Sequence, residues 1–290
     1  MKAPAVSYAR PHRLADALAL LEAHGDEARL LAGGQTLMAT LNMRLSEPAL
    51  LIDMQSVAEL KGLQLSGNVL RIGAMVTHSE IETSALVAQH APLLTRAAPH
   101  IAHRAIRNLG TFGGSIAYGD PAAEWPACLL ALDGMVLVRS LAGERRIAAG
   151  DFFTGLYTTA LGANEVIVAC EIPVAATNQR IAFDELARRH GDYAVVGLAA
   201  STRWTGSAFD QVRLAWLGVG HQPARSIATE QLLQGQRMSD ELLAGAVQCL
   251  RDELLTQADL THSAAAKQHL AGVMLKRSLK ALATPAAATA

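Results

Sequence analysis

The chain has 290 residues, of which 51% are hydrophobic and 18% charged, and its formal net charge is −1. This composition is typical of a globular protein long enough for two domains, and it excludes an intrinsically disordered chain. The balanced charge also provides no basic surface for DNA or RNA.

The first 54 residues have the pattern of a compact β–α–β unit. Leu14, Leu18 and Leu21 share one helical face, which indicates an amphipathic helix. The predicted elements of this unit are a helix ending at His24–Gly25, a strand at 28–32, a helix at 36–45 and a strand at 49–54.

A second unit extends to about residue 175. Its predicted elements are a strand or strand pair at 67–76, a helix opened by the Thr-x-x-Glu capping box at 77–80, helices at 92–102 and 126–132, and strands at 134–140 and 164–173. The segment "HRAIRNLGTFGGSIAYGDPAAEWPA" (103–127) is rich in glycine and has little periodicity, which predicts a long loop. A loop of this length inside a compact domain is usually functional.

The last third changes character after a linker at 174–180. Its predicted elements are three antiparallel strands at 180–190, 194–204 and 211–220, helices at 239–255 and 263–283, and a frayed tail in "ATPAAATA" (283–290). No stretch reaches the roughly 18–20 apolar residues of a membrane span, and the N-terminus lacks the apolar core of a signal peptide.

Neither the cysteines nor the histidines predict a metal site. Cys128, Cys170 and Cys249 are far apart, without the spacing of a disulfide framework, an iron–sulfur cluster or a structural zinc site. His100 and His103 lie three residues apart but have no carboxylate or cysteine at ligand spacing. We therefore predict no metal on this chain and a reducing compartment.

Two Gly-Gly motifs carry the strongest functional signal. In "AGGQTL" (32–37) a glycine pair follows a predicted strand and precedes Thr36 at a helix start, and "TFGGS" (111–115) repeats the arrangement with Ser115 after the pair. Either pair alone is compatible with a plain tight turn. Together they could hold the two phosphates of a dinucleotide, because glycine lets a backbone approach a phosphate closely. Neither motif is a Rossmann fingerprint or a Walker loop.

Two carboxylates follow the second motif. Asp120 and Glu124, in "YGDPAAEWPA" (118–127), would repel a phosphate but could accept hydrogen bonds from ribityl or ribose hydroxyls. The structural alternative is that Asp120 caps a helix starting at Pro121 with Glu124 in its first turn.

These segments resemble the flavin-binding medium subunit of molybdenum hydroxylases, the family of carbon monoxide, xanthine and aldehyde dehydrogenases. The family pattern A-G-G-x-[ST]-L, T-[IL]-G-G-[SN] and D-P-A-A-[DE] occurs here in order, with Phe112 in place of the usual aliphatic residue. "FDELARRHGDYAVVGLAAS" (183–201) resembles a further family segment, E-x-x-R-R-x-[GN]-D-[YF]-A. The resemblance therefore covers essentially the whole chain.

The resemblance implies an α+β fold: a two-lobed FAD-binding domain of the PCMH/VAO type (1–175, with lobes at about 1–57 and 58–175) and a C-terminal domain (180–285) with a three-stranded antiparallel sheet and helices. It also implies that the two loops hold the FAD diphosphate, that Asp120 and Glu124 lie at the ribityl chain, that Tyr193 lies against the isoalloxazine ring and that Arg188 lies near the flavin. From the residues alone, Tyr193 is also compatible with a half-buried strand tyrosine and Arg188 with a solvated charge. The implied FAD-binding residues are Ala32, Gly33, Gly34, Gln35, Thr36, Leu37, Thr111, Phe112, Gly113, Gly114, Ser115, Asp120, Glu124, Arg188 and Tyr193.

The resemblance further implies an electron-transfer subunit with no catalytic residue for the substrate. Its partners would be a large molybdopterin subunit and a small subunit with 2Fe-2S clusters, assembled as a dimer of heterotrimers, with NAD, a quinone or another external acceptor. The complex would be cytoplasmic, with any membrane association made through partners. Two alternatives remain open at this point: a self-contained FAD-dependent reductase similar to the enolpyruvyl-sugar reductases, and a redox-inactive nucleotide-binding scaffold.

Overall fold

The N-terminal end of the chain forms a small parallel sheet. In the computed structural model, which describes residues 2–284, its strands pair in the order β1-β3-β2, and both pairings are parallel. Its elements are β1 (Ser7–Ala9), α1 (Leu14–His24), β2 (Ala28–Leu31), α2 (Leu37–Asn42) and β3 (Leu50–Asp53). The leucine face of α1 is buried against this sheet as its spacing predicts, so the β–α–β unit is confirmed.

The second sheet has five antiparallel strands in the order β4-β5-β10-β6-β7. Its elements, with the short pieces between them, are β4 (Leu63–Ser66), β5 (Val69–Gly73), β6 (Met135–Ser140), β7 (Gly143–Ala148), α9 (Ala149–Phe152), β8 (Phe153–Gly155), β9 (Thr158–Thr159) and β10 (Val166–Pro173). The sequence did not predict β4 or β7, because these edge strands are short and mostly exposed and so give little hydrophobic pattern.

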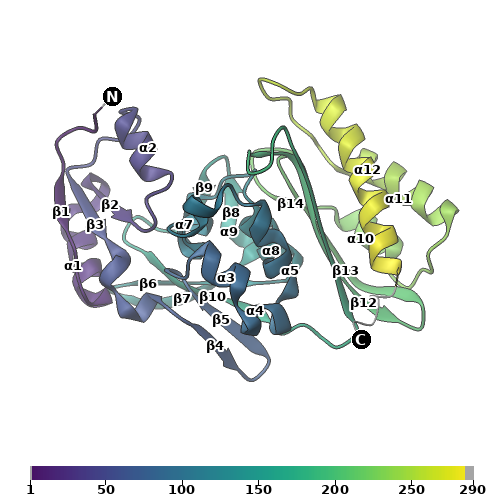
Figure 1. The fold of residues 1–290 in the computed structure, drawn as a ribbon, viewed down its shortest axis with the longest axis horizontal. Helices are drawn as coiled ribbons and strands as arrows, with labels where there is room; N and C mark the ends of the chain where they lie inside the picture. The colour runs from purple at the N-terminus through teal and green to yellow at the C-terminus, as the bar shows by residue number, and fades with distance from the viewer. Residues whose placement is uncertain (1, 285–290) are drawn as a thin grey trace.

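A layer of helices covers one face of this sheet (Figure 1). Its helices are α3 (His78–Thr83), α4 (Ala85–His90), α5 (Pro92–Ala97), α6 (Arg104–Arg107), α7 (Phe112–Tyr118) and α8 (Glu124–Ala131). The capping box before α3 is confirmed, since Thr77 accepts from the Glu80 N–H and Glu80 accepts from the Thr77 N–H.

The prediction of a long loop at 103–127 is wrong, because α6, α7 and the start of α8 occupy most of it. The periodicity was hidden for a physical reason. Every residue of α8 is buried, so this helix has no polar face, and α7 contains two glycines that show no apolar stripe. The alternative of a helix starting at Pro121 is also wrong: α8 begins at Glu124, with Ala123 as its N-cap residue.

The C-terminal third contributes the last two layers. Its sheet is the predicted meander with a two-residue fourth strand, in the order β11-β12-β13-β14. Its elements are β11 (Gln179–Ala187), β12 (Ala194–Thr205), β13 (Ala208–Leu217), β14 (Ala224–Arg225), α10 (Ile227–Leu233), α11 (Asp240–Glu253) and α12 (Ala264–Ala283). Helices α5 and α8 pack on one face and α10–α12 on the other (Figure 1), which explains the almost unbroken apolar run in β12. Of the predicted tail, residues 285–290 lie outside the described residues.

The remaining single turns are 3-10 helices, η1 (Gly25–Glu27), η2 (Met54–Ser56), η3 (Ala58–Leu60) and η4 (Ala98–His100). No helix between residues 2 and 284 is long and apolar enough to cross a bilayer.

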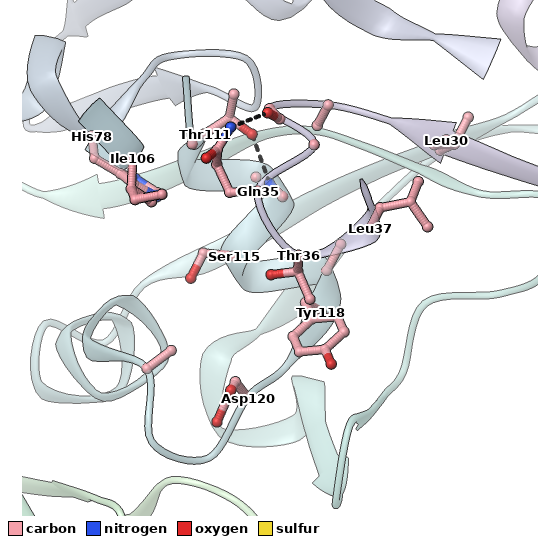
Figure 2. A pocket seen from close by; sticks show the side chains of 18 of the residues that line it. Leu30, Gln35, Thr36, Leu37, His78, Ile106, Thr111, Ser115, Tyr118 and Asp120 are labelled. Atoms are coloured by element: carbon pink, nitrogen blue, oxygen red, sulfur yellow. Dashed lines mark hydrogen bonds between the residues drawn. The ribbon is translucent and has the colours of Figure 1, made fainter. Parts of the chain in front are cut away.

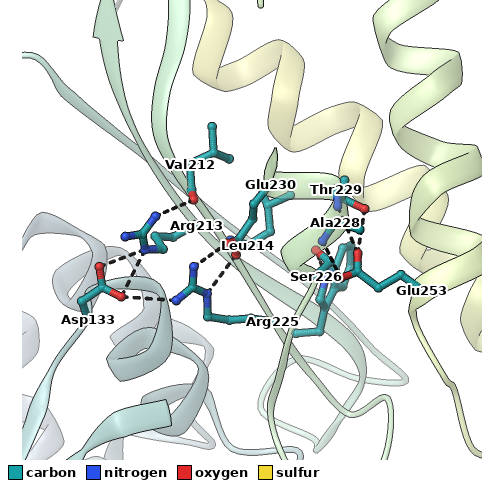
Figure 3. A network of polar contacts seen from close by, with 11 residues as sticks. Asp133, Val212, Arg213, Leu214, Arg225, Ser226, Ala228, Thr229, Glu230 and Glu253 are labelled. Carbon is teal, nitrogen blue, oxygen red and sulfur yellow. Dashed lines mark hydrogen bonds and ion pairs between the residues drawn. The ribbon is translucent and has the colours of Figure 1, made fainter. Parts of the chain in front are cut away.

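Ion pairs connect the turn after α8 to the C-terminal sheet (Figure 3). The Arg213 Nε lies 2.9 Å from Asp133 Oδ2, and Arg225 Nη1 lies 3.4 Å from Asp133 Oδ1. Arg225 also pairs with Glu230, whose Oε1 accepts the Leu214 N–H at 2.8 Å. The Asp133 side chain is 50% exposed and that of Glu230 only 5%, so the two carboxylates differ mainly in burial.

We predict that Glu230→Ala lowers the free energy of unfolding by about 3 kcal/mol, because it leaves a buried N–H and a guanidinium without their acceptor. Asp133→Ala is the matched control and should cost about 1 kcal/mol or less, since its ion pairs are half-exposed. Urea unfolding of both variants measures the difference. Equal losses would show that burial does not decide the strength of these pairs.

Candidate functional site

A cavity of about 680 Å³ lies where the two N-terminal sheets and the C-terminal domain meet. All the residues singled out from the sequence line it except Phe112 and Arg188. Its volume is in the range of small-molecule and cofactor sites, and its wall combines polar loops with the apolar side chains of Ile101, Ile106 and Leu161. Figure 2 shows the facing loops with Thr36 on one side and Ser115 on the other.

The first loop presents a row of free backbone donors to this cavity. The N–H groups of Gly33, Gly34, Gln35 and Thr36 have no acceptor among residues 2–284. Gly34 has φ +71°, the left-handed conformation that turns successive N–H groups toward one point, and Gln35 Nε2 donates to the Gly33 carbonyl at 2.9 Å. Such a concave row of N–H groups is suited to an anion.

The second loop uses its backbone differently. Its N–H groups at Phe112, Gly113 and Gly114 donate to the Val76 carbonyl, the Ala74 carbonyl and Thr111 Oγ1 respectively. Within the described chain, only the Thr111 N–H of residues 111–114 has no acceptor. This loop therefore offers the cavity one free N–H and the Ser115 hydroxyl, rather than a second row of donors.

The glycines are required chiefly for contacts inside the protein. A Cβ on Gly33 would lie 2.1 Å from the Leu109 carbonyl oxygen, and one on Gly113 would lie 2.5 Å from the Ala74 Cβ. A Cβ on Gly114 would lie 2.8 Å from Thr111 Oγ1. The bare backbone therefore lets the two loops touch each other and the sheet, and this contact holds the free N–H groups in place.

Phe112 and Arg188 lie away from the cavity. Phe112 is fully buried, with its ring 5.3 Å from the Trp125 ring, so it belongs to the core. Arg188 is exposed at the end of β11 and is absent from the cavity wall. Among residues 2–284, no group of three or more His, Cys, Asp or Glu side chains could hold a metal ion.

Two buried carboxyl groups, those of Asp120 and Glu124, line the cavity. Asp120 is 8% exposed and accepts the Ala122 N–H at 2.9 Å in the turn before α8, so it is not the helix cap considered above. Glu124 is 9% exposed, and burial raises its pKa to about 7. On the neighbouring strand β11, burial and the Glu124 carboxyl raise the pKa of Glu185 to about 8, and Glu185 Oε2 has no hydrogen-bond partner.

Tyrosines surround the Asp120 carboxyl. Tyr193 lines the cavity yet is 68% exposed, because it stands in the turn before β12 and not in the strand. That turn packs against the N-terminal half, since a Cβ on Gly191 would lie 2.7 Å from the Ala102 carbonyl oxygen. Tyr118 also lines the cavity, and its ring lies 5.0 Å from that of Tyr157. Burial, with the Asp120 charge as a further cause, raises the pKa of all three phenols.

Sequence reasoning missed Tyr118 and His78 as residues of the cavity wall. Tyr118 begins the segment 118–127 that was already singled out, so its proximity to the second Gly-Gly motif was the available signal. His78 stands in the capping box, where its neighbours explain the local pattern without it. Only the packing of α3 against the second loop brings it to the cavity.

Comparison with known proteins identifies the family. The family model described as the FAD binding domain in molybdopterin dehydrogenase matches residues 4–175, and that described as the CO dehydrogenase flavoprotein C-terminal domain matches residues 181–282. The chain belongs to this flavoprotein family. Its cofactor is FAD, and it is an oxidoreductase subunit.

Relatives match the flavoprotein along nearly its whole length. The nicotine 6-hydroxylase medium subunit of Paenarthrobacter nicotinovorans is 39% identical, covering 96% of this chain and 98% of the relative. A structure of carbon monoxide dehydrogenase from Hydrogenophaga pseudoflava matches with a TM-score of 0.95 at 35% identity, covering 97% of this chain and 98% of the other. Quinoline 2-oxidoreductase from Pseudomonas putida 86 matches with a TM-score of 0.92 at 37% identity, with the same coverage. The expected α+β fold is confirmed.

We predict that Gly33→Ala destabilises the flavin-free protein by about 2 kcal/mol or more, because the new Cβ meets backbone atoms of the other loop. Gly245→Ala is the control, since its Cβ would meet nothing within 4 Å, and in α11 it should stabilise slightly. Urea unfolding without FAD is the measurement. If Gly33→Ala lost only FAD affinity and no stability, the glycine would serve ligand approach and not loop contact.

The raised carboxyl pKa values predict a pH dependence of stability. Between the ordinary glutamate pKa of 4.5 and the folded values of about 7 and 8, the folded protein holds protons that the unfolded chain releases. The stability of the flavin-free protein should therefore be highest near pH 5 and fall by several kcal/mol as pH rises to 8.

Glu185→Gln should flatten this decline. Glu241→Gln is the control: Glu241 is an exposed residue with a lowered pKa, so its contribution is lost only as pH falls below the ordinary glutamate range. Unfolding curves at several pH values test both variants. If stability fell with pH as steeply in the Glu185→Gln protein as in wild type, the raised pKa of Glu185 would not be a cause of the decline.

Proposed function

We propose that this flavoprotein passes electrons from the iron–sulfur clusters of a partner subunit to an external acceptor, within a heteromeric molybdenum hydroxylase. The observation that carries the proposal is the cavity, in which a row of free N–H groups faces hydroxyl and carboxyl side chains in a chain of this family. Relatives named medium subunit or medium chain support an assembly with larger and smaller partners.

The residues divide the cavity into two ends of different chemistry. At one end, Gly33–Thr36 and the Thr111 N–H would hold the diphosphate, with the Thr36 and Ser115 hydroxyls beside them. At the other end, Asp120 and Glu124 would accept hydrogen bonds from ribityl hydroxyls. Figure 2 shows the Asp120 side chain apart from Gln35 and Thr111, so this carboxyl would not repel the phosphates.

The Tyr193 side chain would lie against the isoalloxazine ring. An exposed aromatic ring on the wall of a cavity leaves a flat apolar face for a flat ligand, and the contact of Gly191 with Ala102 keeps its turn in place. Arg188 is not assigned a flavin contact, because it is absent from the cavity wall.

When bound, FAD accepts electrons one at a time and gives up two together, which connects iron–sulfur clusters to acceptors such as NAD or a quinone. We place the substrate chemistry on a large molybdopterin subunit and the 2Fe-2S clusters on a small subunit, in a cytoplasmic dimer of heterotrimers. The role of this chain is to hold the cofactor, orient it and exclude water from part of its surface.

The test is to purify this chain alone and with its proposed partners. Alone, it should bind one FAD, show a flavin absorption spectrum and oxidise no substrate. With the partners, substrate should bleach the flavin. A chain that does not bind FAD would refute the proposal, and one that by itself reduces a substrate with NADPH would instead support the self-contained reductase.

We predict that Tyr193→Ala weakens FAD binding about tenfold, as expected when a ring contact worth about 1 kcal/mol or more is removed. Tyr193→Phe is the matched control and should bind FAD normally, because it keeps the ring and loses only the hydroxyl. Fluorescence titration of the apoprotein measures both. If the two variants bound FAD alike, the ring of Tyr193 would not contact the flavin.

A further inference from the structure

His78 is wedged against the second loop. As the first residue of α3, it donates its backbone N–H to the Gly110 carbonyl at 2.9 Å. Its ring lies against the same glycine, since a Cβ on Gly110 would be 2.6 Å from Nε2. Gly110 in turn touches the first loop, because a Cβ on Gly33 would lie 2.8 Å from the Gly110 Cα. The imidazole therefore lies where the two loops converge.

Trp125 determines which ring nitrogen of His78 carries the proton. Trp125 Nε1 lies 2.9 Å from His78 Nδ1, and an indole N–H can only donate. Nδ1 is therefore the acceptor, and the proton of the neutral ring is on Nε2. Burial and the charge of Arg107 lower the pKa of His78 to about 4, so the ring is neutral at physiological pH.

The Nε2–H of His78 has no acceptor among the described residues. His78 is only 6% exposed and lines the cavity, so this donor can be satisfied only from the cavity side. Trp125 is 1% exposed and packs edge-on against Phe112, which leaves the imidazole little freedom to turn away. His78 Nε2 is not one of the fully enclosed polar atoms left without a partner, so this donor is open to a ligand or a water in the cavity.

We infer that His78 donates its Nε2–H to a diphosphate oxygen of the bound dinucleotide, which makes it a binding residue of the flavin site. The inference rests on the proposed function, because it requires FAD in this cavity. Its position beside Gly110 and Gly33 directs the bond to the end of the cavity that holds the free N–H groups. A neutral donor held in one tautomer adds a hydrogen bond there without adding a titrating charge.

The test compares two amide variants of His78 in the flavin-free chain. His78→Asn retains an acceptor for Trp125 near Nδ1 but cannot reach the Nε2 position, whereas His78→Gln can place an amide nitrogen there. We expect the Asn variant to bind FAD about ten- to hundredfold more weakly, the range for one hydrogen bond to a charged group, and the Gln variant to recover most of the loss.

ADP is the second probe, because it carries the diphosphate without the flavin. Its affinity, measured by calorimetry, should fall by a similar factor in the Asn variant. If FAD affinity fell and ADP affinity did not, the bond to the diphosphate would be refuted. If wild type bound FAD and both amide variants bound it equally well, His78 would have no binding role, while the proposed function would stand. A wild type that bound no FAD would refute the proposed function itself.

A measurement on the unaltered protein covers the case in which the variants fold poorly. In wild type labelled with nitrogen-15 at histidine, the His78 signals should report a proton on Nε2 across neutral pH. The Nε2 signal should shift when ADP is added. A proton on Nδ1, or an Nε2 signal that ADP leaves unchanged, would overturn the inference.

Discussion

The site depends on one close backbone contact between the loop after β2 and the loop between α6 and α7. Gly33 lies so near Leu109 and Gly110 that no side chain fits between them. The contact joins the parallel sheet to the helical layer of the five-stranded sheet and closes one end of the cavity. It also places residues 33–36, whose N–H groups have no acceptor among residues 2–284, in the wall of the same cavity as Thr111 and His78. Without it, the donors would face solvent from separate surfaces.

The two loops look alike in sequence but use their backbone N–H groups differently. The first loop leaves its N–H groups free because Gly34 takes a left-handed turn away from regular structure. The second loop leads directly into α7, and its N–H groups donate to the Ala74 and Val76 carbonyls and to Thr111 Oγ1. The first loop therefore offers the backbone donors suited to an anion, and the second loop supports it and adds the Ser115 hydroxyl.

The C-terminal domain completes the cavity and removes solvent from the Glu124 carboxyl group. Helix α8 lies between the helical layer and the C-terminal sheet, so every one of its residues is buried, and the carboxyl at its first position loses solvent. Glu185 from β11 and Tyr193 from the turn before β12 belong to that domain, yet they act on Glu124 and on the cavity wall. Desolvated carboxyls beside a flavin site would remain partly protonated near neutral pH.

The sequence by itself determined the family, the α+β elements with clear periodicity and the residues of the two loops. Leucine spacing, strand alternation and short motifs involve residues that are near one another in the chain. They can therefore be recognised without knowing which distant segments pack together. Only the tertiary structure decided that 103–127 is helical, that Phe112 belongs to the core and that His78 reaches the cavity. These outcomes depend on which surfaces meet: a helix buried on all sides has no amphipathic signature, and a histidine becomes a fixed donor only when Trp125, distant along the chain, packs against it.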